Sequence, residues 1–420
     1  MNNSLKVLSI AAFVLVIFYF ALDVRSCIFK IIPPDSITYI DASNMLFDEM
    51  KPHPIRPLGY AFISGLPKII YPSLSINQYI AFSVFVNILA WAFSIILFYK
   101  TLMIYFIDRV SFLFTLILIF SFSGVAHVFC MLTESIVCFF LSLITYCMLK
   151  YNKSKKTKHL IISTTLLNLA ILIKPGFFYL GICASLGLIF FMIYIDKNIG
   201  SKKLLSFFIL SITLIAIQNI EVYRNYGKLT TSFIDKITWY HYLGARSYAV
   251  ANKIPLTSVK ESRLLNLSDK SFGEISQICK DDFKWQMTNH PHVVFKQLIL
   301  NIFENSIYGS DVIKLIQKEN KNKLSGAFSK VLYKITALQN FVFIFVFLIS
   351  VIMILRSFFS QNIAIILLAS LVAYVILSSG ISFWQGDRFH YILYQTIIAI
   401  FILLLKDKPF AQQWLKQQKP

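Results

Sequence analysis

The chain has 420 residues, of which 57% are hydrophobic and only 14% are charged, and its mean hydropathy is +0.68. This composition excludes a soluble globular domain and predicts an all-α integral membrane protein. The formal net charge is +20. In a membrane protein such a charge is expected to face anionic lipid headgroups and the cytoplasm, so nucleic acid is not an expected partner.

Apolar runs long enough to span a bilayer recur along the chain. The first run follows Lys6 and has no small-x-small cleavage site after it, so we predict a retained span and not a signal peptide. In total we predict about ten transmembrane helices, at residues 6–23, 79–99, 110–130, 134–150, 159–174, 177–195, 204–223, 341–357, 362–382 and 389–405.

The short loops set the expected orientation. Residues 150–158, residues 196–203 and the tail at 406–419 are rich in lysine. The positive-inside rule places all three in the cytoplasm if the N-terminus is also inside. The loop at 24–78 and the segment at 225–340 then lie on the outer face of the cytoplasmic (inner) membrane.

This topology divides the chain into three predicted parts. Residues 1–224 form an N-terminal transmembrane module with a first outer loop at 24–78 that contains an amphipathic helix. Residues 225–340 form a small, mainly helical extracytoplasmic domain, and residues 341–420 form a C-terminal transmembrane module. After residues 290–292 apolar side chains recur at helical spacing, which is typical of a helix lying on a membrane surface.

The six cysteines show no metal-ligand spacing. Cys27 and Cys279 both fall in predicted outer segments, so a disulfide between them and two free thiols are both compatible with the sequence.

The first long polar stretch, residues 33–60, carries the most informative pattern. A helix is expected to begin at Pro34, with Asp35 accepting hydrogen bonds from the backbone of the next turn. Tyr39 would lie one turn further along, on the same face. Prolines then end the helix and form a stiff turn that presents Arg56.

Further ionisable residues occur where predicted spans begin or end, namely Glu134, Lys174, Arg224, Asp387 and Arg388. Burial of a charge in hydrocarbon is costly, so such residues mark functional sites or act as interfacial anchors. The predicted topology sends all of them to the outer face. There they would join Asp35 and Arg56.

Four short stretches follow one another along the chain: Asp35-Ser36 with Arg56-Pro57 in the first loop, Thr133-Glu134-Ser135, Ile173-Lys174-Pro175-Gly176 and Gly386-Asp387-Arg388-Phe389. In this order they resemble the outer-loop motifs of the GT-C glycosyltransferases, which include protein mannosyltransferases and lipid A aminoarabinose transferases. The resemblance implies an inverting transfer of sugar from a polyprenyl-phosphate carrier. It does not extend to residues 225–340. Ser36 stands where many members have glutamate, which leaves open whether Mg²⁺ or Mn²⁺ takes part.

The residues themselves suit this chemistry. The chain has no G-x-G-x-x-G or P-loop motif for a nucleotide, and a lipid-phosphate donor needs interfacial cations. Asp35 is the candidate general base, and Glu134 is expected to orient the acceptor or to position a cation. The candidate phosphate-binding residues are Arg56, Lys174, Arg224 and Arg388. Expected at the substrate are Tyr39, Tyr60 and Asp387; Tyr39, Tyr60 and Trp384 alternatively belong to the interfacial aromatic belt.

We therefore predict a glycosyltransferase that moves sugar from a polyprenyl-phosphate carrier to an envelope lipid, glycan or protein. One alternative is a transporter or flippase for a lipid-linked or anionic solute, which predicts ionisable groups near span centres and broken, repeated helices. The other alternative is a non-catalytic subunit of an envelope assembly, for which Asp35 and Arg56 would be dispensable.

Overall fold

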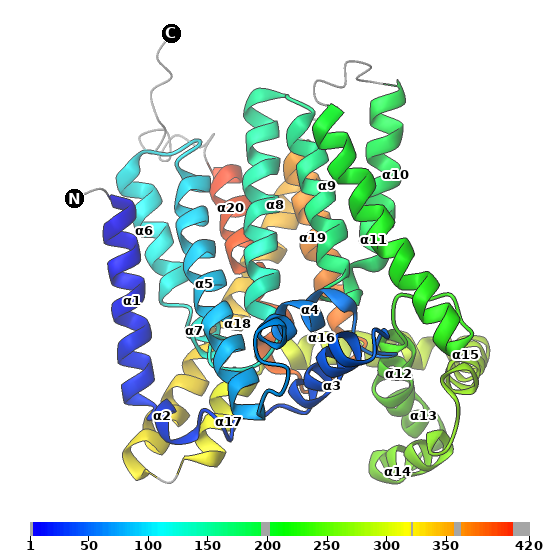
Figure 1. Cartoon of the computed structure of the whole chain (residues 1–420). Coiled ribbons are helices and arrows are strands. Elements are labelled where there is room, and N and C mark those ends of the chain that lie inside the picture. The colour runs from blue at the N-terminus through cyan, green and yellow to red at the C-terminus, as the bar shows by residue number, and fades with distance from the viewer. Residues whose placement is uncertain (1–2, 195–201, 321, 357–362, 406–420) are drawn as a thin grey trace.

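The computed structural model describes residues 3–194, 202–320, 322–356 and 363–405 (Figure 1). Every regular element in these ranges is an α-helix or a short 3-10 helix. The predicted all-α class is therefore confirmed.

Among the described residues, seven helical segments are long and apolar enough to cross a membrane. They are α1 (Asn3–Ala21), α5 (Ile76–Leu102), α8 (Glu134–Ser154), η2 (Pro175–Phe177) continued by α10 (Phe178–Tyr194), α11 (Lys202–Tyr226), α18 (Lys323–Arg356), and η4 (Gly386–Phe389) with η5 (Tyr391–Leu393) and α20 (Tyr394–Leu405). Their number and composition indicate a multi-pass membrane protein.

The remaining three predicted spans correspond to shorter helices. Two are α9 (Lys158–Ile171) and α19 (Ile363–Ser379). The span expected at 110–130 is broken into α6 (Asp108–Ile119) and α7 (Phe122–His127). At the break the side chain of Gln339 donates to the carbonyl of Phe120 at 2.8 Å and accepts from the N–H of Phe122 at 3.3 Å. A side chain from α18 thus satisfies the backbone that the break leaves unpaired. The count of ten spans stays a prediction.

The polar segments gather at one end of the helical bundle, the lower end in Figure 1. The first loop contributes α2 (Val24–Cys27), α3 (Pro34–Asp48), α4 (Leu58–Gly65) and η1 (Leu66–Ile69). The segment after α11 contributes α12 (Ile234–His241), α13 (Leu243–Asn252), α14 (Leu256–Leu267), α15 (Phe272–Asn289), α16 (Pro291–Ile307) and α17 (Asp311–Glu319). The start of α1 and the connection from α8 to α9 lie at the opposite end. Which end faces the cytoplasm stays a prediction.

Helix α3 begins as its prolines require, because Pro34 occupies the first helical position, where a missing N–H has no cost. The expected cap is wrong. Pro33 is the N-cap residue, no side chain caps the helix, and the carboxylate of Asp35 binds arginines instead. Helix α3 packs closely on α4, where the hydroxyl of Ser43 lies 2.7 Å from that of Ser64. Small side chains at this contact let the two backbones approach.

The segment between α11 and α18 is helical, but its predicted limit at residue 340 falls inside α18, which already begins at Lys323. Within this segment α16 turns a polar face inward: Asn301 donates to the carbonyl of Gly380 at 2.8 Å, and Asn305 donates to that of Ser379 at 3.0 Å. Its opposite face exposes Phe295, Ile299 and Phe303. This arrangement suits the expected helix on a membrane surface.

Cys27 and Cys279 are both buried and carry free thiols. They belong to separate clusters of buried residues, so the structure does not contain the disulfide considered from the sequence.

Candidate functional site

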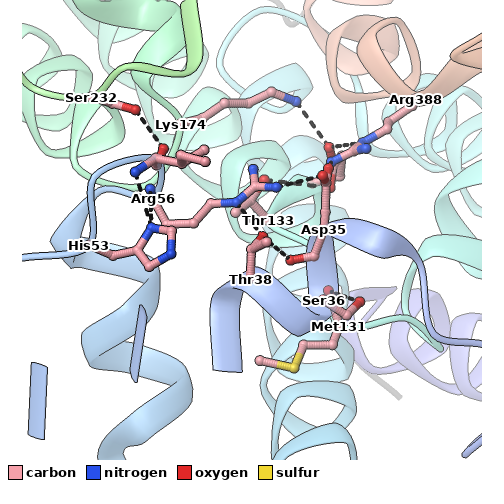
Figure 2. A network of polar contacts seen from close by, with 12 residues as sticks. Asp35, Ser36, Thr38, His53, Arg56, Met131, Thr133, Lys174, Ser232 and Arg388 are labelled. Carbon is pink, nitrogen blue, oxygen red and sulfur yellow. Dashed lines mark hydrogen bonds and ion pairs between the residues drawn. The ribbon is translucent and has the colours of Figure 1, made fainter. Parts of the chain in front are cut away.

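Five charged side chains from five separate segments meet at the lower end of the bundle. They come from α3, the loop before α4, the first turn of α8, the connection between α9 and η2, and η4. The residues are Asp35, Arg56, Glu134, Lys174 and Arg388. We call this group the charge cluster. Figure 2 shows Arg56 and Arg388 reaching Asp35 from opposite sides.

Asp35 lies between two guanidinium groups. Its Oδ1 accepts from Nη2 of Arg56 at 2.5 Å, and its Oδ2 lies 2.7 Å from Nη2 of Arg388. Burial raises the pKa of Asp35, but the charges of Arg388 and Arg56 outweigh burial and lower that pKa from 3.8 to about 2. The carboxylate is therefore ionised at neutral pH. Its side chain is 30% exposed, so a ligand can reach it.

Glu134, the first residue of α8, is completely buried and binds two positively charged side chains. Its Oε1 accepts from Nε of Arg388 at 2.5 Å and from Nζ of Lys174 at 3.1 Å. Arg388 thus bridges both carboxylates. Three positive and two negative side chains leave the charge cluster with a net charge of +1.

Arg56 contacts two more neighbours, Thr38 and Tyr39. Its Nε donates to the hydroxyl of Thr38 at 2.7 Å, and its guanidinium lies 4.5 Å from the ring centre of Tyr39. Tyr39 in turn meets Tyr60 edge to face at 4.5 Å. Cation–π contact and the hydrogen bond fix the plane of the guanidinium. Thr38 is not among the predicted site residues, although its spacing from Asp35 places both on one face of α3.

A tight turn presents Arg56. The Nδ1 atom of His53 accepts from the backbone N–H groups of Ile55 and Arg56, at 3.1 and 3.0 Å. Ser232 from the segment before α12 donates to the carbonyl of Ile55 at 2.5 Å, as Figure 2 shows. Burial and the charge of Arg56 lower the pKa of His53 from 6.5 to about 4, so the ring is neutral and free to accept.

Two contacts bring the first loop against the bundle. The hydroxyl of Ser36 donates to the carbonyl of Met131 at 2.8 Å, next to the start of α8. The N–H of Gly59 donates to the carbonyl of Leu172 at 2.7 Å, close to Lys174. A Cβ on Gly59 would lie 2.5 Å from that carbonyl oxygen, so only glycine permits this approach.

Four predicted site residues lie differently from expectation. Tyr39 and Tyr60 are 3% and 1% exposed, so they support Arg56 from within the protein and do not line an open site. Asp387 is completely buried and accepts from the hydroxyl of Ser123. Arg224 is exposed on α11 and pairs with Glu221 at 2.7 Å, outside the charge cluster.

The donor set does not fit a divalent cation. Both oxygens of Asp35 and Oε1 of Glu134 already accept from positively charged groups. Three cations around two carboxylates would also repel Mg²⁺ or Mn²⁺. The described residues contain no group of three or more histidine, cysteine or acidic side chains arranged to hold a metal.

Comparisons of the chain with family models, with curated proteins and with solved structures find no match.

Proposed function

We propose that the chain is an inverting glycosyltransferase that moves a sugar from a polyprenyl-phosphate carrier to an envelope lipid, glycan or protein. The reaction would take place on the outer face of the cytoplasmic membrane. The observation that carries the proposal is the position of Asp35 between Arg56 and Arg388, at one end of an apolar helical bundle. Burying charged side chains at a membrane interface is costly. A cluster of five charged side chains is therefore not expected there for packing alone.

The charge cluster suits the phosphate of a lipid-linked donor. A phosphodiester carries one negative charge, which balances the net charge of +1. A guanidinium has more N–H groups than the contacts to Asp35, Thr38 and Glu134 use, so Arg56 and Arg388 retain donors for phosphate oxygens. Arg56 and Arg388 therefore bind the donor phosphate and meet the charge that develops on it.

Asp35 is the partly exposed carboxylate of the cluster and takes the role of base. The acceptor oxygen forms a bond to the anomeric carbon while the bond from that carbon to the phosphate oxygen breaks. The acceptor proton goes to Asp35, and the electron pair leaves with the polyprenyl phosphate. A pKa of about 2 makes Asp35 a weak base in the unliganded protein. When the donor phosphate binds, its negative charge partly offsets the charges of Arg56 and Arg388. The pKa of Asp35 then rises, and Asp35 becomes a stronger base.

Glu134 has a positioning role in this scheme. Because Glu134 is completely buried, it does not contact the acceptor. Its contacts to Arg388 and Lys174 hold these two cations in position. Of the two roles expected from the sequence, its geometry favours the positioning of cations.

Proteoliposomes distinguish this proposal from the transport alternative. They would contain the purified protein, a labelled polyprenyl-phosphate sugar and candidate envelope acceptors. We expect a new glycosidic bond with inverted anomeric configuration. Movement of intact donor between leaflets, with no new bond, would instead support a flippase.

A further inference from the structure

Lys260 of α14 lies within a collar of three aromatic rings. Its Nζ is 4.6 Å from the ring centre of Phe383, 5.6 Å from that of Tyr242 and 5.7 Å from that of Trp384. We call these three rings the aromatic collar. Ring faces stabilise an ammonium group that has lost part of its water. The collar therefore holds the positive charge of Lys260 in one place.

Lys260 differs from the cations of the charge cluster in its partners. Arg56, Lys174 and Arg388 each contact a carboxylate. Within the described ranges, no ion pair includes Lys260. Its charge is thus available to an anion from outside the protein.

The collar borders the charge cluster. Burial and the nearby charge of Asp35 raise the pKa of Tyr242, and the charge of Arg388 opposes this rise. The phenol of Tyr242 therefore lies within electrostatic reach of both residues. Phe383 and Trp384 precede η4, the element that carries Arg388, and Phe383 packs edge to face on Tyr242 at 5.5 Å. The collar is therefore directly joined to the element that carries Arg388.

Trp384 adds an open apolar surface. The residue is 55% exposed, and its backbone has φ of +57°, a conformation that large residues rarely adopt. Such strain persists where the surrounding structure enforces it, and it often marks a ligand site. Here it keeps the ring beside the ammonium of Lys260.

We propose that Lys260 and Trp384 form an anion-binding subsite next to the charge cluster, and that this subsite contacts the phosphate of a phosphorylated lipid substrate. This inference rests on the proposed function, because it deepens the recognition of the same donor. The positively charged ammonium of Lys260 already occupies the collar, so the ligand of the subsite is an anion and not a cation. Lys260 donates to a phosphate oxygen, and the ring of Trp384 covers the apolar part of the substrate next to it.

Binding of a labelled polyprenyl phosphate to the full chain in nanodiscs tests the subsite. Lys260→Met keeps the length of the side chain but removes its charge, and we expect about 10- to 100-fold weaker binding. Lys260→Arg retains the charge and is expected to bind nearly as the parent protein does. The matched control is Lys284→Met, which alters an exposed lysine of α15 and should leave binding unchanged. Unchanged binding by Lys260→Met would overturn the proposal.

Two further ligands identify what the subsite recognises. Polyprenol without phosphate should bind the parent protein and Lys260→Met equally; an equal loss for polyprenol would assign the collar to the lipid chain and contradict the proposal. Inorganic phosphate should bind far more weakly than the lipid phosphate, and equally tight binding would contradict a lipid substrate. Lipid binding that depends on Lys260, without any sugar transfer, would refute the proposed transferase function but not the subsite. Sugar transfer with unaltered KM in Lys260→Met would refute only the subsite.

Discussion

Arg388 donates to Asp35 across 2.7 Å, although the two residues come from opposite ends of the chain. The same guanidinium contacts Glu134 through Nε at 2.5 Å. One side chain of η4 therefore links this element to the first loop and to the start of α8. The geometry of the charge cluster depends on this link.

Arg388→Lys tests the planar fork directly. A lysine has one nitrogen and cannot hold Asp35 and Glu134 in the same plane, so we expect weaker donor binding by about 10-fold or more. The matched control is Arg224→Lys, because Arg224 is exposed and pairs with its neighbour Glu221, outside the charge cluster. Isothermal or fluorescence titration with a polyprenyl phosphate measures both variants. Equal affinities for the two would show that the phosphate binds elsewhere.

Glu134→Gln tests the buried end of the charge cluster. The variant leaves Arg388 and Lys174 without their shared carboxylate, and removal of one partner from a buried ion pair typically costs about 3–5 kcal/mol. We expect a large fall in the free energy of unfolding, measured by thermal or chemical denaturation in detergent. Glu221→Gln breaks an exposed pair and should cost about 1 kcal/mol or less. Similar stability of both variants would argue against a structural role for Glu134.

His53 predicts a pH dependence. Its pKa is lowered from 6.5 to about 4 in the folded protein, so the unfolded chain binds more protons between these values. The contribution of His53 to stability is therefore complete above pH 6.5 and is lost as the pH falls toward 4. Comparison of unfolding curves for the parent protein and His53→Asn across this range isolates the effect. A difference between them that does not change with pH would contradict the neutral, accepting role of Nδ1.

The orientation is testable by cysteine labelling. Figure 1 places the connection from α8 to α9 and helix α14 at opposite ends of the bundle. Cysteines introduced at 153–157 should react with an impermeant reagent only from the cytoplasm, and those at 255–270 only from outside. Reversed labelling would place the charge cluster on the cytoplasmic side and remove the argument for a lipid-linked donor.

The sequence predicted that the charged residues lie at one common end of the bundle, because the predicted order of the spans places all of them on one side. Asp35, Arg56, Glu134, Lys174 and Arg388 accordingly meet in the structure. It did not predict the face of each helix. Arg224 lies on an exposed face of α11, away from the cluster.

Other features depend on contacts between residues far apart in sequence. Asp35 has the sequence pattern of a helix cap, but its carboxylate binds Arg56 and Arg388 instead of the helix backbone. The break between α6 and α7 depends on Gln339 of a distant helix. Tyr60 looks like an interfacial tyrosine, yet packing on Tyr39 buries it. Local patterns carry no information on these partners.

Transfer of labelled sugar by the purified parent protein and by Asp35→Asn tests the central claim most directly. Asparagine keeps the shape of Asp35 but cannot take the acceptor proton, and general-base catalysis is worth about 100- to 10,000-fold in rate. We predict transfer by the parent protein, a loss of that order in Asp35→Asn, and an unchanged rate in the control Asp41→Asn, which alters an exposed residue of the same helix. Transfer by Asp35→Asn at close to the parent rate would contradict the account.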